Sequence, residues 1–299
     1  MGSAMILVIL GVCMVSYSGP LVKGALIAGA NPVTVAMLRM AFASLLLTPL
    51  LFIRGKGQEK PAYHELKKLT RRQWLWSLVA SAALALHYLT WMTSLASTST
   101  FASVALVCTQ PLFVALVSAV VLKEYMPRSA WPGAILAVAG AIVIAVASLS
   151  GGAGGDLAGD MLALLGALMM ALHWLFSRYA RKSIDALPFS LLVYIQTALF
   201  LALLMPFFGG FHVTGKALLY ILGLALGCTV LGHFLFQIAL GKVSATVVAF
   251  AILGEPVGAM VFSYFMFGER PTNTVLIGGA LVLLGLIMYT AASAKNENN

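Results

Sequence analysis

Residues 110–124, QPLFVALVSAVVLKE, and residues 255–269, EPVGAMVFSYFMFGE, decide the fold of this chain. The two stretches stand 145 positions apart (255 − 110), and the same spacing pairs residues beyond them. The matched pairs are Gln110 with Glu255, Pro111 with Pro256, Ser118 with Ser263, Glu124 with Glu269, Gly133 with Gly278, and Gly140 with Gly285. The spacing predicts two related halves, residues 1–150 and residues 151–299.

Each stretch has a proline at its second position, inside an apolar run. A proline within a membrane helix removes one backbone hydrogen bond and leaves a carbonyl free, here that of Val107 or Ile252. Equivalent helix breaks in the two halves of a membrane protein are typical of secondary transporters. We therefore expect Pro111 and Pro256 to serve as hinges or gates.

The composition places the chain among integral membrane proteins. Of its 299 residues, 61% are hydrophobic and 9% are charged, and the mean hydropathy is +1.00, whereas about a quarter of the residues of a soluble domain are charged. The net charge of +9 comes from basic residues between apolar segments. That pattern orients membrane proteins and does not indicate nucleic-acid binding. Three scattered cysteines, each in an apolar run, predict neither disulfides nor a metal site.

Ten apolar segments are long enough to cross a bilayer, for which a helix needs about 20 residues. They cover residues 4–28, 32–53, 73–96, 99–122, 128–149, 157–181, 187–208, 214–240, 243–267 and 272–293. Five segments belong to each half. The predicted fold class is an all-α integral membrane protein with ten transmembrane helices.

Basic residues orient these segments. The connection between the second and third segments carries seven Lys and Arg residues, from Arg54 to Arg72, and such a loop is expected in the cytoplasm. That assignment places both termini in the cytoplasm, with 14 basic residues inside against three outside, namely Lys23, Lys216 and Arg270. Because each half has an odd number of segments, the second five-helix repeat is inverted relative to the first.

The paired helices resemble those of the drug/metabolite transporter superfamily and, within it, the EamA-type exporters. The likeness covers nearly the whole chain and is most specific in TFASVALVCTQPLFVALVSAVVLKE, residues 100–124, and SATVVAFAILGEPVGAMVFSYFMFGER, residues 244–270. Residues 86–113, LHYLTWMTSLASTSTFASVALVCTQPLF, also resemble YddG-type aromatic amino-acid exporters of Gram-negative inner membranes. The resemblance implies a basket of helices around a central cavity, in a multi-pass exporter of the bacterial inner membrane.

Polar residues inside the segments are the candidates for a substrate site, because such groups are costly in hydrocarbon and are expected to face the interior. The candidate substrate-binding residues are His87, Tyr88, Trp91, Gln110, His173, Trp174, His233 and Glu255. Arg39 in the second segment and Gln237 in the eighth are also polar. Aromatic rings, imidazoles and N–H or O–H donors suit a zwitterion with a flat apolar side chain. We predict export of aromatic and other apolar amino acids by alternating access.

Several candidates also have a purely structural interpretation. The tryptophans suit packing or the membrane interface, Tyr88 suits contact with a neighbouring helix, and the histidines suit hydrogen bonds between helices. Glu255 could couple transport to protons, or it could be a neutral or paired structural acid beside Arg39, because Gln110 at the equivalent place cannot titrate. Glu124 and Glu269 are interpreted as helix-end caps or gate contacts.

Other classes of protein would need patterns that the sequence lacks. An enzyme would need clustered carboxylates, a metal-binding pair of histidines or an activated nucleophile, and an ATP-driven pump would need a P-loop. We therefore expect no enzymatic activity, no cofactor and no metal. The expected partners are a small-molecule substrate and the lipid bilayer, without nucleic acid, and the expected state is a monomer. Two alternatives stay open: an exporter of another amphipathic solute or drug-like cation, and a gradient-driven facilitator or channel.

Overall fold

The computed structural model describes residues 2–52, 61, 63–123, 127–149, 156–180, 184–232, 235 and 252–297. Within these ranges every regular element is a helix, which confirms the all-α prediction for this part of the chain. The α-helices are α1 (Gly2–Ser16), α2 (Ser18–Ile27), α3 (Pro32–Leu47), α4 (Tyr63–Leu66), α5 (Arg71–Ser97), α6 (Thr100–Val107), α7 (Gln110–Val117), α8 (Trp131–Leu149), α9 (Leu157–Ala180), α10 (Ala186–Leu204), α11 (Gly215–Gly223), α14 (Glu255–Phe267) and α15 (Asn273–Glu297). Ser118–Leu122 and Leu224–Gly232 are π-helical, and Thr48–Phe52, Arg128–Ala130 and Met205–Phe207 are 3₁₀ turns.

Nine helical stretches among the described residues are long and apolar enough to cross a membrane. They are Ile6–Ile27, Pro32–Phe52, Arg71–Ser97, Thr100–Val120, Arg128–Ala147, Leu157–Ala180, Leu187–Phe207, Gly215–Gly232 and Asn273–Ala292. Each overlaps one of the predicted segments. The predicted segment 243–267 begins outside the described residues, and α14 is the helix described within it. The chain is a multi-pass membrane protein.

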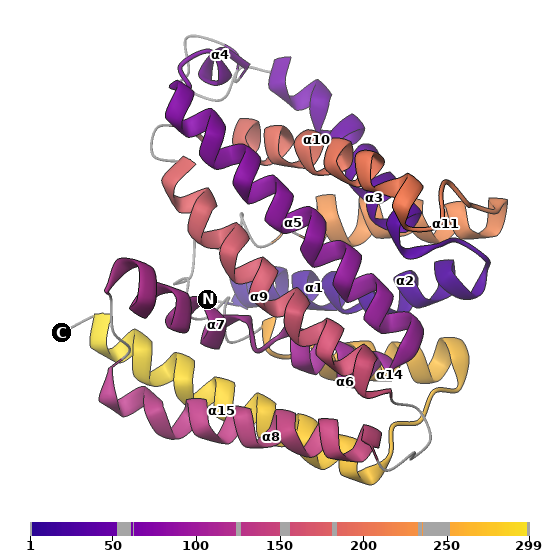
Figure 1. Ribbon diagram of the computed structural model, residues 1–299, viewed down its shortest axis with the longest axis vertical. Coiled ribbons are helices and arrows are strands. Elements are labelled where there is room, and N and C mark those ends of the chain that lie inside the picture. The colour runs from indigo at the N-terminus through magenta and orange to yellow at the C-terminus, as the bar shows by residue number, and fades with distance from the viewer. Residues whose placement is uncertain are drawn as a thin grey trace.

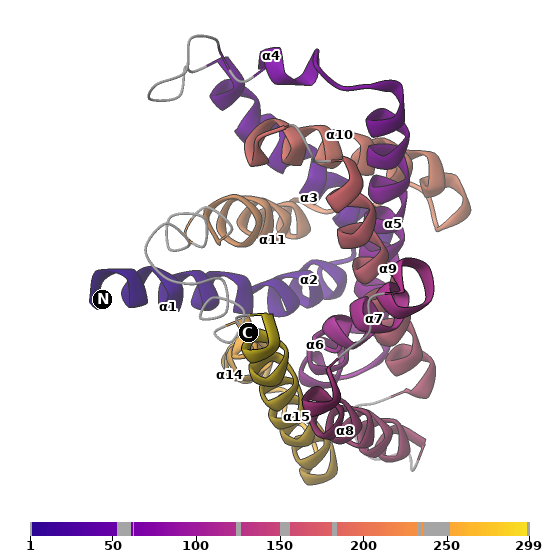
Figure 2. The ribbon, with the colours of Figure 1, turned by 90° about the vertical axis from the view of Figure 1, so that its left-hand side faces the viewer.

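The helices run side by side, so their connections gather at two ends of the molecule (Figure 1). The start of α1, the end of α15 and α4 lie towards the left of that view, which we call the terminal end. The connections α2–α3, α10–α11 and α14–α15 lie at the right, which we call the distal end. Figure 2 looks at the molecule from its terminal end, with α3 and α10 at the top, α5 and α9 at the right, and α8 and α15 at the bottom.

Side-chain caps fix where several helices begin. The Asn31 carboxamide oxygen accepts a hydrogen bond from the Thr34 N–H at 2.9 Å, at the start of α3. Thr70 and Gln73 form a reciprocal capping box at the start of α5, and Ser99 caps α6 by accepting from the Ala102 N–H at 3.2 Å. Each cap pairs an N–H that has no partner within its helix. The short connection between α5 and α6 confirms the predicted break at residues 97–100.

Three described spans or segments are interrupted within the predicted membrane region. Tyr17 separates α1 from α2, and Cys108 and Thr109 separate α6 from α7. Pro111 lies in the first turn of α7, and Pro256 lies in the first turn of α14, directly after a turn at residues 253–254. A proline is tolerated there because the first N–H groups of a helix have no partner within it. The predicted helix breaks at both prolines are therefore confirmed.

Glycines bring α8 and α15 into backbone contact. A Cβ added to Gly140 would lie 2.5 Å from the Val282 nitrogen and 2.6 Å from the Gly278 oxygen. Likewise, a Cβ on Gly133 would lie 2.6 Å from the Gly285 oxygen. Gly133 therefore faces Gly285 and Gly140 faces Gly278, which shows that the two helices are antiparallel. The sequence repeat pairs Gly133 with Gly278 and Gly140 with Gly285, so each contact joins glycines from different pairs. Small residues permit this close approach of helices in a membrane.

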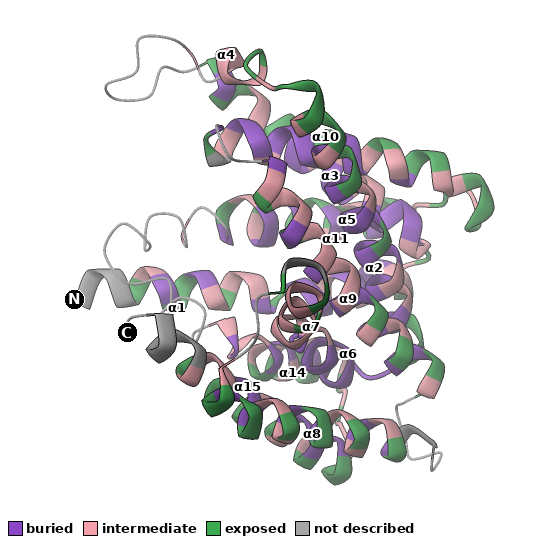
Figure 3. Ribbon diagram, turned by 60° about the vertical axis from the view of Figure 1, so that its left-hand side comes forward, coloured by how far each residue is buried: buried purple, intermediate pink, exposed green. Residues whose placement is uncertain are grey.

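The most buried spanning helix in the described residues is α5. Of its membrane-spanning window 67% is buried, compared with 33% for the windows in α8 and α15. Figure 3 shows the exposed residues of α8 and α15 at the edge of the molecule. Many of them are apolar, such as Ile135 and Ile277, which suits a surface that faces lipid. Polar side chains on α5 are consequently the ones placed in the interior of the bundle.

Candidate functional site

Three of the predicted site residues form one buried group on α5. His87, Tyr88 and Trp91 are 3%, 6% and 5% exposed. The ring centroids of His87 and Trp91 lie 5.8 Å apart with their planes at 16°, and those of His87 and Tyr88 lie 5.0 Å apart at 58°. Residues four apart share a helix face, and on that face the rings of His87 and Trp91 stack.

Two histidines join α5 to α9 by reciprocal hydrogen bonds. The Nδ1 of His87 lies 2.9 Å from the Gly166 carbonyl oxygen on α9, and the Nδ1 of His173 lies 2.9 Å from the Ala80 carbonyl oxygen on α5. A carbonyl oxygen only accepts, so each Nδ1 carries the hydrogen and donates it. The Nε2 of each neutral imidazole is then an acceptor. Both histidines therefore have a structural contact on one nitrogen and a second nitrogen for other chemistry.

Arg39 of α3 completes this group of buried side chains. The sequence alone did not predict that this charge lies beside the aromatic residues. Its Nε donates to the Thr229 hydroxyl at 2.9 Å, and its Nη1 donates to the Ser18 hydroxyl at 3.4 Å. The guanidinium carbon lies 4.7 Å from the centroid of the Tyr88 ring, which is a cation–π distance. The guanidinium thereby connects α2, α3, α5 and the π-helical segment Leu224–Gly232.

A cleft of about 620 Å³ opens between α9 and α10. It is lined by His173, Trp174, Ser177, Arg178, Phe189, Ser190, Val193 and Tyr194. Trp174 is 46% exposed, so it belongs to the wall of the cleft and not to the buried group on α5. Ala167 and Ala171 lie on the same face of α9 and are fully buried. This face of the helix is therefore covered by neighbouring helices near Gly166 and becomes accessible near Arg178.

Tyr194 relates the cleft to the buried group. This residue lines the cleft and packs against the hydrophobic core that contains Tyr88 and Trp91. Sequence reasoning missed it, as well as the cleft residues contributed by α10. The available signal was the i, i+4 spacing of Ser190 and Tyr194, which places two polar side chains on one face of an otherwise apolar helix.

The structure does not join the remaining candidates directly to His87 and Trp91. Gln110 and Glu255 are half-buried at the first positions of α7 and α14. Glu255 interacts electrostatically with Arg39 but forms no ion pair with it. His233 lies outside the described residues, as do Gln237 and Glu124.

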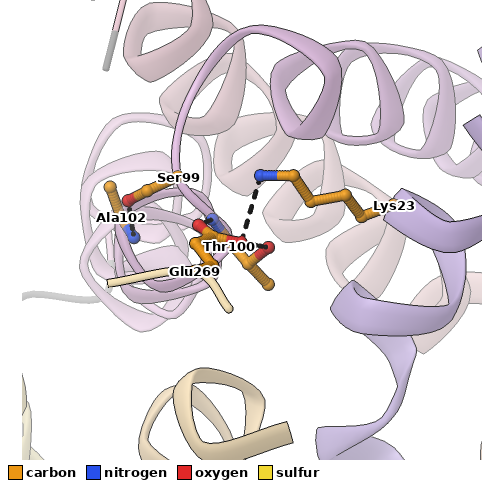
Figure 4. A network of polar contacts seen from close by, with 5 residues as sticks. All are labelled: Lys23, Ser99, Thr100, Ala102 and Glu269. Carbon is orange, nitrogen blue, oxygen red and sulfur yellow. Dashed lines mark hydrogen bonds and ion pairs between the residues drawn. The ribbon is translucent and has the colours of Figure 1, made fainter. Parts of the chain in front are cut away.

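At the distal end, Glu269 ties three elements together (Figure 4). Its carboxylate forms an ion pair with Lys23 of α2 at 3.1 Å and accepts from the Thr100 hydroxyl at 2.8 Å. The same carboxylate accepts from the Thr100 N–H in the first turn of α6, where a negative charge is stabilised by the helix dipole. Glu269 thus caps α6 from the end of another helix.

Nothing in the described residues assembles a metal centre. No group of three or more His, Cys, Asp or Glu side chains there could hold an ion. The groups that the described site offers are aromatic faces, N–H donors, imidazole nitrogens and hydroxyl groups.

Two parts of the chain, residues 2–146 and 157–291, match the profile of the EamA-like transporter family. YwfM of Bacillus subtilis, an uncharacterized transporter, is 27% identical over 235 residues, which cover 77% of this chain and 79% of YwfM. An uncharacterized transporter of Archaeoglobus fulgidus is 25% identical over 270 residues, which cover 87% of this chain and 88% of the relative. A solved crystal structure aligns with 99% of both chains at a TM-score of 0.61 and 15% identity, which is a likeness of fold alone.

Proposed function

The chain belongs to the EamA-like transporter family, and we propose that it exports small metabolites, above all aromatic and other apolar amino acids. The observation that carries the substrate class is the buried group of His87, Tyr88 and Trp91 with Arg39 beside it. The likeness of residues 86–113 to YddG-type exporters supports the same substrates. We place the protein in the bacterial inner membrane, with the terminal end in the cytoplasm.

The chemistry of the site suits an amphipathic solute. Aromatic rings favour stacked or edge contacts with another ring, each adding about 0.5–1.5 kcal/mol beyond the burial of area. The cleft of about 620 Å³ falls within the 300–1,000 Å³ range that is usual for small-molecule sites. A free amino acid in this cleft would meet Trp174 and Tyr194 in its wall, and movement of the helices around it would bring its ring against the buried Tyr88 and Trp91.

For the mechanism we propose alternating access between two inverted five-helix repeats. The two separate family matches and the reciprocal glycine contacts of α8 with α15 support an arrangement related by a pseudo-two-fold axis. Breaks at Pro111 and Pro256 supply equivalent hinges. Contacts of Glu269 with Lys23 and Thr100 would hold the distal end closed while the cleft between α9 and α10 admits solute.

Transport by the purified protein in liposomes tests this function. Labelled phenylalanine or tryptophan should cross the membrane of vesicles that contain the protein faster than that of empty vesicles. Trp91→Ala should reduce this flux by about tenfold while the protein stays folded, because it removes the stacking surface. Flux equal to that of empty vesicles for every aromatic and apolar amino acid would contradict the substrate class.

The pH gradient separates coupled export from facilitated diffusion. If Glu255 couples transport to protons, an imposed gradient will concentrate phenylalanine against its own gradient, and Glu255→Gln will abolish accumulation while leaving downhill exchange. A carrier that only equilibrates its solute will show the same final level with and without the gradient. The measurement also distinguishes the carrier from a channel, because only a carrier shows exchange of labelled for unlabelled solute that exceeds net flux.

A further inference from the structure

We propose that Arg39 binds the anionic group of the transported solute, so that the site selects molecules in which a carboxylate is joined to a flat apolar body. This inference rests on the proposed function and specifies its substrate class. It assigns to α3 a role that neither the aromatic pattern nor the cleft shows by itself.

Arg39 carries its charge in a place where a charge is costly. The residue lies in the middle of α3 and is 5% exposed. Arginine inside a membrane span is rare and normally pairs with another group or with a ligand. Among the described residues, no carboxylate forms an ion pair with Arg39, whereas Lys23 has Glu269 at 3.1 Å. The charge of Arg39 therefore has no direct counter-ion in this part of the chain.

The groups around Arg39 hold its side chain without neutralising it. Hydroxyl groups of Thr229 and Ser18 accept from Nε and Nη1, and the Tyr88 ring lies at 4.7 Å. A guanidinium has five N–H donors, and among the described residues two of them form hydrogen bonds. The donors without a partner in this part of the chain lie in a fixed plane and match the two oxygens of a carboxylate, which arginine binds in a bidentate manner.

A donor of the aromatic group also lacks an acceptor. The indole N–H of Trp91 is buried without a hydrogen-bond partner among the described residues. Trp91 stacks on His87, which contacts the same Tyr88 that lies under Arg39. A buried donor without a partner costs about 1–3 kcal/mol. An unpaired N–H in the aromatic group beside Arg39 therefore favours a solute that offers an acceptor, such as a carboxylate.

Glu255 does not take the place of that anion here. It attracts Arg39 electrostatically, yet the two form no ion pair. The cleft offers an approach, because Tyr194 lines it and packs against the hydrophobic core that contains Tyr88 and Trp91. A solute that enters between α9 and α10 would meet the aromatic rings and the guanidinium in the same region.

Binding of three matched solutes tests the inference on the full chain in lipid nanodiscs. Phenylalanine has a carboxylate and an ammonium, 3-phenylpropionate has the carboxylate alone, and phenethylamine has the ammonium alone. We expect both carboxylates to displace labelled phenylalanine, and phenethylamine to bind at least tenfold more weakly. Arg39→Gln should weaken the binding of both carboxylates about tenfold or more and leave that of phenethylamine unchanged.

Two further variants guard against a loss of folding. Arg39→Lys keeps the charge but loses the planar fork, so carboxylate binding should fall several-fold in a protein whose buried charge is retained. Thr229→Val removes one hydrogen bond of Arg39 and should retain most of the carboxylate binding. Thermal unfolding of each variant shows whether the protein is folded. If Arg39→Gln is not folded, the carboxylate affinities of Arg39→Lys and Thr229→Val are compared to decide whether Arg39 binds the carboxylate.

Distinct outcomes overturn the inference and the proposed function. Equal affinity for phenethylamine and 3-phenylpropionate, absence of carboxylate binding, or unchanged carboxylate affinity in Arg39→Lys and Arg39→Gln overturns the role of Arg39. Transport of phenethylamine by a protein that does not bind carboxylates would also overturn the role of Arg39, although the protein would still be a transporter. Arg39-dependent carboxylate binding without flux of any bound solute overturns the transport proposal and leaves the anion site.

Discussion

Two antiparallel helix pairs hold the bundle together in opposite ways. Between α8 and α15 the contact is backbone on backbone, at Gly133 with Gly285 and Gly140 with Gly278. Between α5 and α9 it consists of hydrogen bonds from imidazoles to carbonyls, at His87 with Gly166 and at His173 with Ala80. In both pairs the two contacts are seven residues apart, which is about two helical turns.

The difference separates scaffold from site. The contact of α8 with α15 is made mainly by backbone atoms, with the Ile144 side chain beside Gly278, and the pair lies at the edge of the molecule (Figure 3). The contact of α5 with α9 is made by side chains, and it borders the cleft and the aromatic group. Small residues give van der Waals contact between close backbones, whereas polar groups give directional bonds that can be exchanged. The first pair should tolerate no added volume, and the second should tolerate graded changes.

Breaking the glycine contact should have the largest effect. Gly140→Leu forces a side chain into the backbone of α15, at 2.5 Å from the Val282 nitrogen, and overpacking costs about 1–3 kcal/mol, or more where backbone must move. We expect loss of most of the folded protein, measured by size-exclusion chromatography in detergent. Gly227→Leu is the matched control, because no atom lies within 4 Å of its added Cβ. Equal yields for the two variants would remove the distinction.

Removing one imidazole should have the next largest effect. His87→Leu removes the hydrogen bond that joins α5 to the Gly166 carbonyl oxygen, which costs about 0.5–1.5 kcal/mol, and it removes the ring that stacks on Trp91, which costs about as much again. The midpoint of thermal unfolding should fall by several degrees, and His87→Gln should recover part of the loss because its amide can donate. His212, exposed at the distal end, provides His212→Leu as a control with an unchanged midpoint. A midpoint of His87→Leu equal to that of the control would show that the hydrogen bond contributes nothing.

A smaller loss is expected where α5 and α9 meet at the distal end. The Thr98 hydroxyl, directly after α5, donates to the Asp160 carboxylate at 2.8 Å, and Thr98→Val should cost about 1 kcal/mol. Thr93→Val is the comparison, since the Thr93 hydroxyl bonds only to the Leu89 carbonyl of its own helix among the contacts described. The difference between the two unfolding midpoints measures the bond between helices. Identical midpoints would assign the rigidity of α5 and α9 to packing and the histidines.

The smallest effect on stability should come from Trp91→Phe. The indole nitrogen has no partner among the described residues, so its removal relieves an unpaired donor and offsets the cost of the small cavity left by the smaller ring, and the change in unfolding free energy should stay within about 0.5 kcal/mol. Flux of phenylalanine should nevertheless fall if the indole N–H binds solute. Trp131→Phe, at a 54% exposed position on α8, should change neither quantity. A stability loss above 1 kcal/mol for Trp91→Phe would indicate a structural bond of the indole.

The sequence predicts the helices and their breaks because each has a local cause. Apolar length sets the spans, Pro111 and Pro256 set two of the breaks, and the matched glycines indicate close packing. The stacking of His87 on Trp91 follows from their spacing on one helix. All of these features depend on residues within about one turn or on one repeated pattern.

The partners of polar residues could not be predicted, since they lie on helices far apart in sequence. Arg39 meets Thr229 across 190 positions, and His173 meets Ala80 across 93. The sequence shows that these groups are costly in a membrane, but not which neighbour relieves the cost. Tyr194 was missed for the same reason, because its place in the wall of the cleft depends on how α10 packs beside α9. The assignment of His233 falls outside the described residues.

The π-helical winding of Leu224–Gly232 has a consequence for Arg39. Within it the Thr229 hydroxyl donates to the Leu224 carbonyl oxygen at 3.1 Å, five residues earlier, and accepts from the Arg39 Nε. A π-helical turn holds one more residue between bonded groups than an α-helical turn, and each residue of an α-helix advances the rotation by about 100°. If this π-helical turn became an α-helical turn, Thr229 would rotate about the axis of its helix and its hydroxyl would move away from the Arg39 Nε. A local change of helical pitch could therefore release the guanidinium without a change in the tilt of any helix.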